Sequence, residues 1–282
     1  MKSSDTRIPA RLQARLDVVK GLAIFRFALD RDFHFLSGQY ATLWLTHHDR
    51  TIPRPYSIAS SPSETRVLEL YISKVEEGEL TPSLWSREVL RNLKSGSPET
   101  SLSITGPRGR FLLERDDPRD LVFVGSGTGV APFISMTRAL NEEYLASPNN
   151  FRPRKIFIIH GARSARSLGY HRELERLAGE SLREPGRRLS IVYLPTVSRA
   201  QFEPEWKGLK GRAESLFEDP PTEGSPLELE VTVRRMFQYL LRPETHAVYV
   251  CGHAGTVDNV AEALRHRGFK LNRDIKREKY YA

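Results

Sequence analysis

The fold of this chain is decided by the stretch Leu121-Val122-Phe123-Val124-Gly125-Ser126-Gly127-Thr128-Gly129-Val130-Ala131-Pro132. Its first four residues form a short continuous apolar run, which is typical of a strand buried on both faces of a parallel sheet. Three glycines within five residues follow, and an amphipathic segment then begins at residue 131. A strand, a glycine-rich turn and a helix in this order predict one repeat of an α/β fold.

The pattern of that repeat continues toward the C-terminus. Brief apolar runs lie at 156–159, 191–194 and 248–250, and amphipathic segments lie at 131–144, 170–182 and 256–267. The region 203–245 is rich in prolines and basic residues, and we expect a helix there only at 231–241. Alternating strands and helices predict a doubly wound parallel sheet over residues 120–282.

Upstream of the opening stretch, the sequence is typical of antiparallel β structure. Short segments with β-branched and aromatic residues, separated by glycine and proline, lie at 11–16, 22–29, 40–46 and 67–73. Only 82–93 has a helical pattern in this half. A charged segment with a proline at 114–119 marks the expected domain boundary. We therefore expect two domains, an N-terminal antiparallel β-barrel over 1–115 and the α/β domain over 120–282.

The composition of the 282-residue chain limits the classes of function. With 39% hydrophobic and 28% charged residues it resembles a folded protein, and no run approaches the roughly 20 apolar residues of a membrane helix. Its single cysteine, Cys251, excludes an internal disulfide and a cysteine-ligated zinc or iron–sulfur site, so we expect no metal and a cytoplasmic location. The formal net charge of +8 is spread along the chain, which argues against nucleic-acid binding and fits an acidic protein partner or anionic cofactors.

The motif Arg54-Pro55-Tyr56-Ser57 combines residue types that suit a phosphorylated aromatic ligand. Arg54 offers a fork of donors to a pyrophosphate, Tyr56 a flat face and Ser57 a hydroxyl. Followed by Ile58-Ala59-Ser60, the motif resembles the flavin signature of the ferredoxin–NADP reductase superfamily. The resemblance implies that Tyr56 stacks on an isoalloxazine ring and that Ser57 lies near flavin N5. A strand end followed by a surface turn is the simpler alternative.

A second segment supports the same resemblance. A strand ending in Tyr71-Ile72-Ser73 leads to Gly78-Glu79-Leu80-Thr81, which resembles the turn that opens a helix beneath the FAD phosphates in bacterial members. Free backbone N–H groups at a helix start suit an anion, as does the nearby hydroxyl of Thr81. An ordinary capped helix would have the same residues. The resemblance assigns to the FAD site Tyr71, Ile72, Ser73, Gly78, Leu80 and Thr81.

The glycine-rich turn of the second domain has its own ligand preference. It is not Gly-x-Gly-x-x-Gly, since residue 130 is valine, and it lacks the lysine of a P-loop, which argues against ATP or GTP. It resembles the Gly-Thr-Gly-x-Ala-Pro loop of the same superfamily, which implies that Gly127, Thr128 and Gly129 lie against the nicotinamide half of NADP(H). Glycines permit close approach to a planar ligand, and a helix start favours its pyrophosphate.

Three arginines lie at positions that would determine the preference for NADP(H) over NAD(H). Arg163 and Arg199 follow two of the expected strands, and Arg212 lies in the loop beyond. Because the carboxyl ends of parallel strands meet at one edge of a sheet, these side chains can converge on one dianion. The trio resembles the bacterial cluster for the 2′-phosphate of NADP. Solvated arginines without a ligand are the alternative.

The last expected strand ends in Cys251-Gly252, and the resemblance places this thiol beside the reacting carbon of the nicotinamide. It further implies that Glu278 stands beside Cys251, that Tyr280 covers the flavin and that Tyr281 lies near the adenine. A buried cysteine that only packs, and a tyrosine pair on a frayed terminus, are the alternatives.

The resemblance spans nearly the whole chain and implies an FAD-dependent oxidoreductase. Such an enzyme exchanges a hydride between NADP(H) and FAD and trades single electrons with an acidic ferredoxin or flavodoxin. The residues expected at the reacting nicotinamide are Ser57, Cys251, Glu278 and Tyr280. A reductase component of an oxygenase, or a free-flavin reductase, stays open because segment 106–111 is closer to the oxygenase-reductase branch. A non-catalytic electron-transfer subunit is another alternative, although related subunits carry a C-terminal cysteine cluster that this chain lacks.

Overall fold

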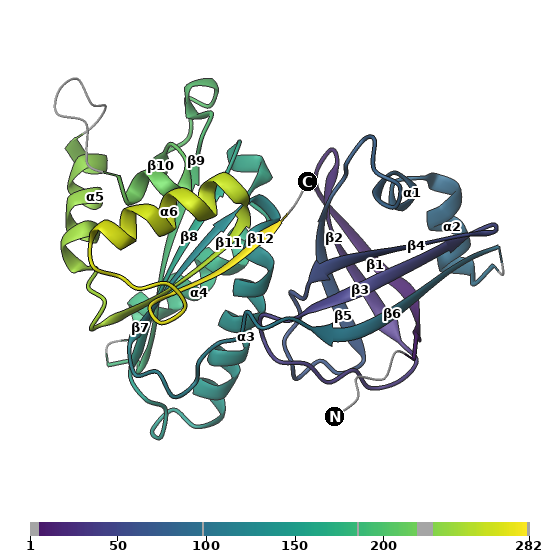
Figure 1. Cartoon of the computed structure of the whole chain (residues 1–282), viewed down its shortest axis with the longest axis horizontal. Helices are drawn as coiled ribbons and strands as arrows, with labels where there is room; N and C mark the ends of the chain where they lie inside the picture. Colours follow the sequence, from purple (N-terminus) through teal and green to yellow (C-terminus); the bar gives the residue numbers. More distant parts are fainter. Residues whose placement is uncertain (1–5, 98, 185, 219–227, 281–282) are drawn as a thin grey trace. The chain divides into compact units, whose positions relative to one another are not determined.

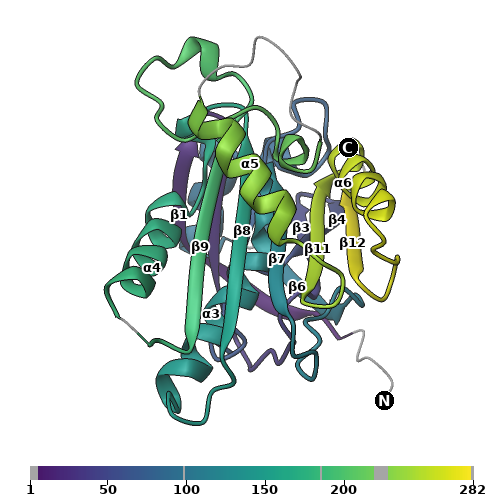
Figure 2. The ribbon, with the colours of Figure 1, turned by 90° about the vertical axis from the view of Figure 1, so that its left-hand side faces the viewer.

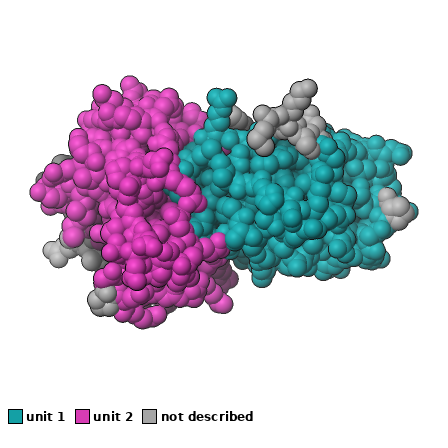
Figure 3. Space-filling model, turned by 90° about the horizontal axis from the view of Figure 1, so that it is seen from below, with its two compact units in different colours: residues 1–113, 131–139 teal, residues 114–130, 140–282 magenta. Residues whose placement is uncertain are grey.

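The computed structural model describes residues 6–97, 99–184, 186–218 and 228–280, and it divides into two compact units (Figure 3). Unit 1 consists of Met1–Leu113 together with Ala131–Ala139, and unit 2 consists of Glu114–Val130 together with Leu140–Ala282. Residues 131–139 were expected in the second domain, because they continue a strand-to-helix pattern. In the structure they pack with the first unit.

Unit 1 is an antiparallel β-barrel, as expected (Figure 1). Its strands are β1 (Ile8–Val19), β2 (Leu22–Leu29), β3 (Tyr40–His47), β4 (Arg50–Ser57), β5 (Val67–Ser73) and β6 (Thr100–Arg108). They pair in the order β4-β3-β6-β1-β2-β5. An isolated antiparallel bridge between Ile58 and Leu70 brings the chain just beyond β4 against β5. The two ends of the sheet therefore meet.

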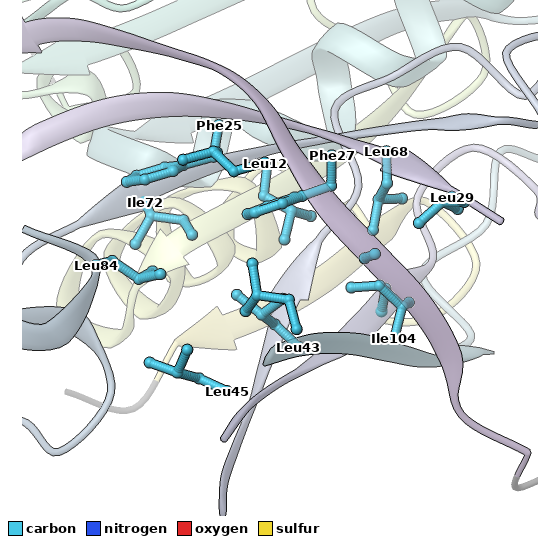
Figure 4. Packing of buried hydrophobic residues seen from close by; sticks show 14 of the residues in the cluster. Leu12, Phe25, Phe27, Leu29, Leu43, Leu45, Leu68, Ile72, Leu84 and Ile104 are labelled. Carbon is cyan, nitrogen blue, oxygen red and sulfur yellow. The ribbon is translucent and has the colours of Figure 1, made fainter. Parts of the chain in front are cut away.

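The interior of the barrel is filled by alternate residues of its strands. On β2 every second side chain is buried, from Ala23 through Phe25 and Phe27 to Leu29, as the period of two in a strand requires. Figure 4 shows Phe25 and Phe27 packed with residues of other strands, among them Leu43 and Ile104. Burial of each such side chain contributes about 1.5–3 kcal/mol. This core holds the ends of β4 and β5 in place.

The helical segment of unit 1 differs from the prediction of one helix over 82–93. The structure has a single turn, α1 (Thr81–Leu84), and then α2 (Arg87–Ser95). The break lies at Ser86, whose backbone is extended. Its hydroxyl caps α2 by accepting a hydrogen bond from the N–H of Val89 at 3.5 Å. A serine that caps a new helix in this way ends the preceding one.

Unit 2 is a doubly wound parallel sheet, as predicted. Its strands are β7 (Asp120–Ser126), β8 (Arg154–Ala162), β9 (Leu189–Val197), β10 (Leu209–Lys210), β11 (His246–His253) and β12 (Ile275–Tyr280). They pair in the order β10-β9-β8-β7-β11-β12, and Figure 2 shows β9, β8, β7, β11 and β12 side by side in this order. Neither β10 nor β12 was predicted, since one has only two residues and the other is rich in charge.

Helices cover both faces of this sheet. Residues of α5 (Glu228–Leu240) and α6 (Ala254–His266) share a hydrophobic core with one face of β7 and β8. Helix α4 (His171–Arg183) lies on the opposite face (Figures 1 and 2). Of the helices in the described part of the chain, none is long and apolar enough to cross a membrane.

Helix α3 (Ala131–Ala146) begins in unit 1, where a buried ion pair ties it to the barrel. Arg138 donates to the carboxylate of Glu69 on β5 at 2.8 Å and to the carbonyl of Ala59 at 3.0 Å. Glu69 is only 3% exposed and also accepts a hydrogen bond from Arg26 at 3.3 Å. A carboxylate buried this deeply needs such partners, because its unpaired charge would be costly to desolvate.

Replacing Arg138 with Leu should therefore lower the free energy of unfolding by about 2–4 kcal/mol, because Glu69 loses an arginine partner in a buried site. Urea denaturation, followed by tryptophan fluorescence and circular dichroism, measures the loss. The matched control is Arg115→Leu, which breaks an exposed ion pair with Glu143 of the same helix and should cost less than about 1 kcal/mol. Equal losses in the two variants would contradict a special role for the buried pair.

Candidate functional site

Arg54, Tyr56 and Ser57 lie on strand β4, whereas the sequence pattern predicted no strand between 46 and 67. Tyr56 packs against the barrel core, and burial raises the pKa of its phenol, an effect that the charge of Arg54 partly opposes. Ser57 is 6% exposed, whereas the side chain of Arg54 is 43% exposed. The motif thus presents a cation at the surface beside a half-buried aromatic ring.

The bridge between Ile58 and Leu70 brings the two predicted FAD segments together. In an antiparallel pair, the residues before Ile58 run alongside those after Leu70, so Ser57 neighbours Tyr71. Ile72 is part of the hydrophobic core, as is Leu80, so only the backbone of either residue is available to a ligand. Two motifs that are separate in the sequence therefore form one surface.

The turn between β5 and α1 is closed by Thr81. Its hydroxyl accepts a hydrogen bond from the N–H of Val75 at 2.9 Å and donates to the carbonyl of the same residue at 3.2 Å. The N–H of Gly78 donates to that carbonyl at 3.0 Å. The hydroxyl of Thr81 therefore shapes the turn, although the sequence pattern predicted that it binds an anion.

Unit 2 has a topological switch point at β7. Its neighbours in the sheet are β8 on one side and β11 on the other, so the chain winds in opposite directions from this strand. Crevices that bind ligands form outside the carboxyl ends of the strands at such points. Gly129, in the turn after β7, lies so close to β11 that an added Cβ would be 2.3 Å from the carbonyl oxygen of Cys251. Gly127 has a φ of +56°, and a Cβ there would meet nothing within 4 Å.

Cys251, Glu278 and Tyr280 form one cluster at β11 and β12. Cys251 is fully buried and stands in register with Gly125 on one side and Glu278 on the other. Its Sγ lies 3.8 Å from a carboxylate oxygen of Glu278. Burial raises the pKa of the thiol well above its usual value, the charge of Glu278 raises it further, and a hydrogen bond with Tyr280 acts in the opposite direction. The thiol is therefore neutral at physiological pH.

The C-terminal residues belong to a strand as far as the structure describes them. Tyr280 is half-buried and pairs with His253 at the end of β12, so it is not on a frayed terminus. Tyr281 lies outside the described residues.

The three arginines lie at adjacent strand ends, on the other side of the turn from Cys251. The N–H of Ser198 donates to the carbonyl of Ala162 at 2.9 Å, and the N–H of Arg199 donates to that of Arg163 at 3.1 Å, which continues the ladder between β8 and β9. Arg212 follows β10, the next strand in the sheet. All three side chains are exposed, and no carboxylate in the described ranges pairs with Arg163 or Arg199.

Two carboxylates near these groups were not predicted from the sequence to have a role. Glu79 binds Arg54 at 2.5 Å. Glu214 is 3% exposed, lies 3.7 Å from Arg212 and has no hydrogen bond to either oxygen from any described residue. The pair of Arg54 and Glu79 depends on tertiary structure, since the two residues are 25 positions apart, whereas Arg212 and Glu214 are only two residues apart. No three metal-binding side chains converge in the part of the chain that the structure describes.

The donors in the two units fit an FAD and a nicotinamide dinucleotide. Unit 1 offers an exposed guanidinium beside Tyr56 and Ser57, which suits a pyrophosphate and a flat ring. Unit 2 offers the open surface at Gly127 at a switch point, with exposed arginines on one side and a neutral thiol on the other. In each unit, the fit to the cofactor follows from the chemical groups that these residues offer.

Comparison with known proteins identifies an FAD-binding and an NAD-binding domain family in this chain. Residues 9–112 match the oxidoreductase FAD-binding domain, and residues 123–262 match the oxidoreductase NAD-binding domain. The ferredoxin–NADP reductase B of Sorangium cellulosum is 33% identical over 205 residues, which cover 71% of this chain and 74% of that protein. The phenol hydroxylase P5 protein of Acinetobacter pittii is 29% identical over 263 residues, 93% of this chain. This chain spans only 61% of the length of that relative.

Among solved structures, the fold is similar to that of a ferredoxin NADP+ reductase from Neisseria gonorrhoeae with bound FAD and NADP. The TM-score is 0.71, the identity is 20%, and 98% of each chain is covered. The FAD-binding and NAD-binding domain matches confirm the expected cofactor classes. On these grounds the chain belongs to the ferredoxin–NADP reductase superfamily and is a flavoprotein oxidoreductase.

Proposed function

We propose that this chain exchanges a hydride between NADP(H) and FAD and passes electrons one at a time to a ferredoxin or flavodoxin. The strand order of unit 2 is the observation that supports this most. Exposed arginines follow β8, β9 and β10 on one side of the glycine-rich turn, and the cluster of Cys251, Glu278 and Tyr280 lies at β11 and β12 on the other. A dinucleotide across the turn would have its 2′-phosphate at the arginines and its nicotinamide near Cys251.

The proposed work of the flavin residues is binding and orientation. Arg54 holds phosphate, Tyr56 offers its face to the ring, and Ser57 offers a hydroxyl donor. The other proposed FAD contacts are Tyr71, Ser73, Gly78, Tyr280 and Tyr281, together with the backbone of Ile72, Leu80 and Thr81. FAD, when bound, supplies an acceptor for a hydride that can release its two electrons separately.

At the proposed nicotinamide site the residues control charge and water. The neutral thiol of Cys251 packs without adding charge, and the carboxylate of Glu278 beside it is a counter-charge for an oxidised, cationic ring. Gly127, Thr128, Gly129 and Gly252 are the proposed backbone contacts of the dinucleotide. Exclusion of water from this site protects the hydride from side reactions.

A second candidate function is that of the reductase component of an oxygenase. It is supported by the similarity to the phenol hydroxylase P5 protein, which extends over 93% of this chain. Both candidates use the same cofactor sites and differ in the protein that accepts the electrons.

Purified protein should bind one FAD per chain and release FAD, not FMN, on denaturation. The exposed guanidinium of Arg54 beside the ring of Tyr56 supports this expectation, because it suits a phosphorylated flavin. Chromatography of the released flavin and its fluorescence before and after phosphodiesterase treatment measure the result. A chain that neither carries a flavin nor takes up added FAD would end the proposal.

Arg163→Ala, Arg199→Ala and Arg212→Ala should each raise the KM for NADPH about 10- to 100-fold and leave that for NADH nearly unchanged. Each contact between an arginine and a phosphate contributes about 1.5–3 kcal/mol, and about 1.4 kcal/mol corresponds to a factor of ten. Arg176→Ala is the matched control, since this arginine lies on α4 and pairs with Glu180. If both coenzymes lose affinity equally, the three arginines have a structural role.

Reduction of an acidic ferredoxin should slow as salt rises, while reduction of a small neutral acceptor should not. The net charge of +8 attracts an acidic carrier, and screening shortens that attraction to about 10 Å at 0.1 M salt. Stopped-flow rates with both acceptors between low and high salt measure the difference. Rates that do not depend on salt with any acidic carrier would favour the oxygenase component or free-flavin reductase.

A further inference from the structure

The carboxylate of Glu79 bridges two arginines of strand β4. One of its oxygens lies 2.5 Å from Nη2 of Arg54, and the other lies 3.7 Å from Nη2 of Arg50. Residues four apart on a strand point to the same face, so Glu79 lies across one face of β4. Its side chain is 54% exposed, which leaves it accessible to solutes.

These contacts engage the guanidinium that a flavin phosphate would use. Nη1 of Arg54 donates to the carbonyl of Pro53 at 2.8 Å, and Nη2 donates to Glu79. A phosphate binds a guanidinium best through two parallel hydrogen bonds along one edge. Both edges of the Arg54 guanidinium that allow this geometry include Nη2, so a phosphate there competes with the carboxylate of Glu79, which has the same sign of charge, for this nitrogen.

We propose that Glu79 is a specificity-determining residue of the flavin site, which competes with flavin phosphates for Arg54. This role rests on the proposed function of Arg54 in phosphate binding. Glu79 lowers the affinity for FAD and FMN, which carry phosphate, and leaves the affinity for riboflavin unchanged. The competition is electrostatic and exposed to solvent, so salt weakens it.

The same turn supplies a matched control. Glu77 lies two residues before Glu79, is exposed and carries the same charge. Glu77→Gln removes one negative charge from the turn without removing the contact with Arg54. A general effect of negative charge would therefore change the affinity for FAD equally in Glu77→Gln and Glu79→Gln. Competition for Arg54 would change it only in Glu79→Gln.

The test is a set of binding titrations with the full chain after its flavin has been removed. Flavin fluorescence and calorimetry give the Kd for FAD, FMN and riboflavin in the wild type, Glu79→Gln, Glu77→Gln, Arg54→Ala and the double variant Arg54→Ala/Glu79→Gln. We expect Glu79→Gln to bind FAD and FMN about 3- to 10-fold more tightly at low salt, with a smaller gain at 0.5 M salt. We expect Glu79→Gln to leave the affinity for riboflavin unchanged, and Glu77→Gln to increase the affinity for FAD and FMN less than Glu79→Gln does. The double variant should bind FAD no more tightly than Arg54→Ala does.

The outcomes separate this role of Glu79 from the proposed function. If Arg54→Ala weakens FAD binding while Glu79→Gln leaves it unchanged or weakens it, Glu79 does not compete and the flavin site stands. If Arg54→Ala leaves the affinity for FAD unchanged, the assignment of the phosphate to Arg54 is wrong. A gain with riboflavin equal to that with FAD overturns competition for the phosphate. Melting temperatures and circular dichroism of each variant show whether a changed Kd reflects altered folding.

Discussion

The glycine-rich turn after β7 lies against the end of β11 with no room for a side chain at Gly129, where a Cβ would be 2.3 Å from the carbonyl of Cys251. β7 and β11 pair directly and join the two halves of the sheet at the switch point, and this close approach continues their contact into the turn. It brings the turn beside the thiol of Cys251, and strand pairing then adds Glu278 and Tyr280 from β12. On the other side of the turn, β8 and β9 end in arginines. A larger residue at 129 would push the turn away from β11. The proposed nicotinamide site would then be displaced from the proposed phosphate site.

Charge is arranged differently in the two candidate cofactor sites. In unit 2, Arg163 and Arg199 are exposed and pair with no carboxylate in the described ranges, so an anion meets no competitor at these two positions. In unit 1, Arg54 is held by the carboxylate of Glu79. The same residue type therefore offers different affinities for phosphate, because the neighbouring carboxylate decides how much of its charge is available. This difference follows from tertiary contacts and not from the arginines themselves.

Much of the fold follows from the sequence, and the elements that were missed have physical reasons. β7 and its turn were predictable because a continuous apolar run before three glycines is typical of a buried strand that leads into a tight turn. β4 was missed as the site of the flavin motif because it contains Pro53 and Pro55. Prolines are tolerated there because β4 is paired along its length only with β3. β12 was missed because a charged sequence is acceptable at the edge of a sheet.

The candidate site was predictable to the extent that it rests on local motifs. Gly127 to Gly129, Arg163 and Cys251 all follow recognisable strands, and parallel strands end at one edge. The pairing of Glu79 with Arg54 was not predictable, since the two residues are 25 positions apart and meet only through the turn that Thr81 closes. Sequence patterns identify which residues are chemically able to bind a cofactor. They do not show which neighbour already holds those residues.

The proposed function requires a dinucleotide to lie across the switch point with its 2′-phosphate at the arginine end. A crystal structure of the holoenzyme with NADP+ bound tests it most directly. We expect the 2′-phosphate to lie within hydrogen-bond distance, about 3 Å, of at least two among Arg163, Arg199 and Arg212, with the pyrophosphate against the turn at Gly127. A 2′-phosphate in solvent, away from all three arginines, or a pyrophosphate that does not contact the turn, would contradict it.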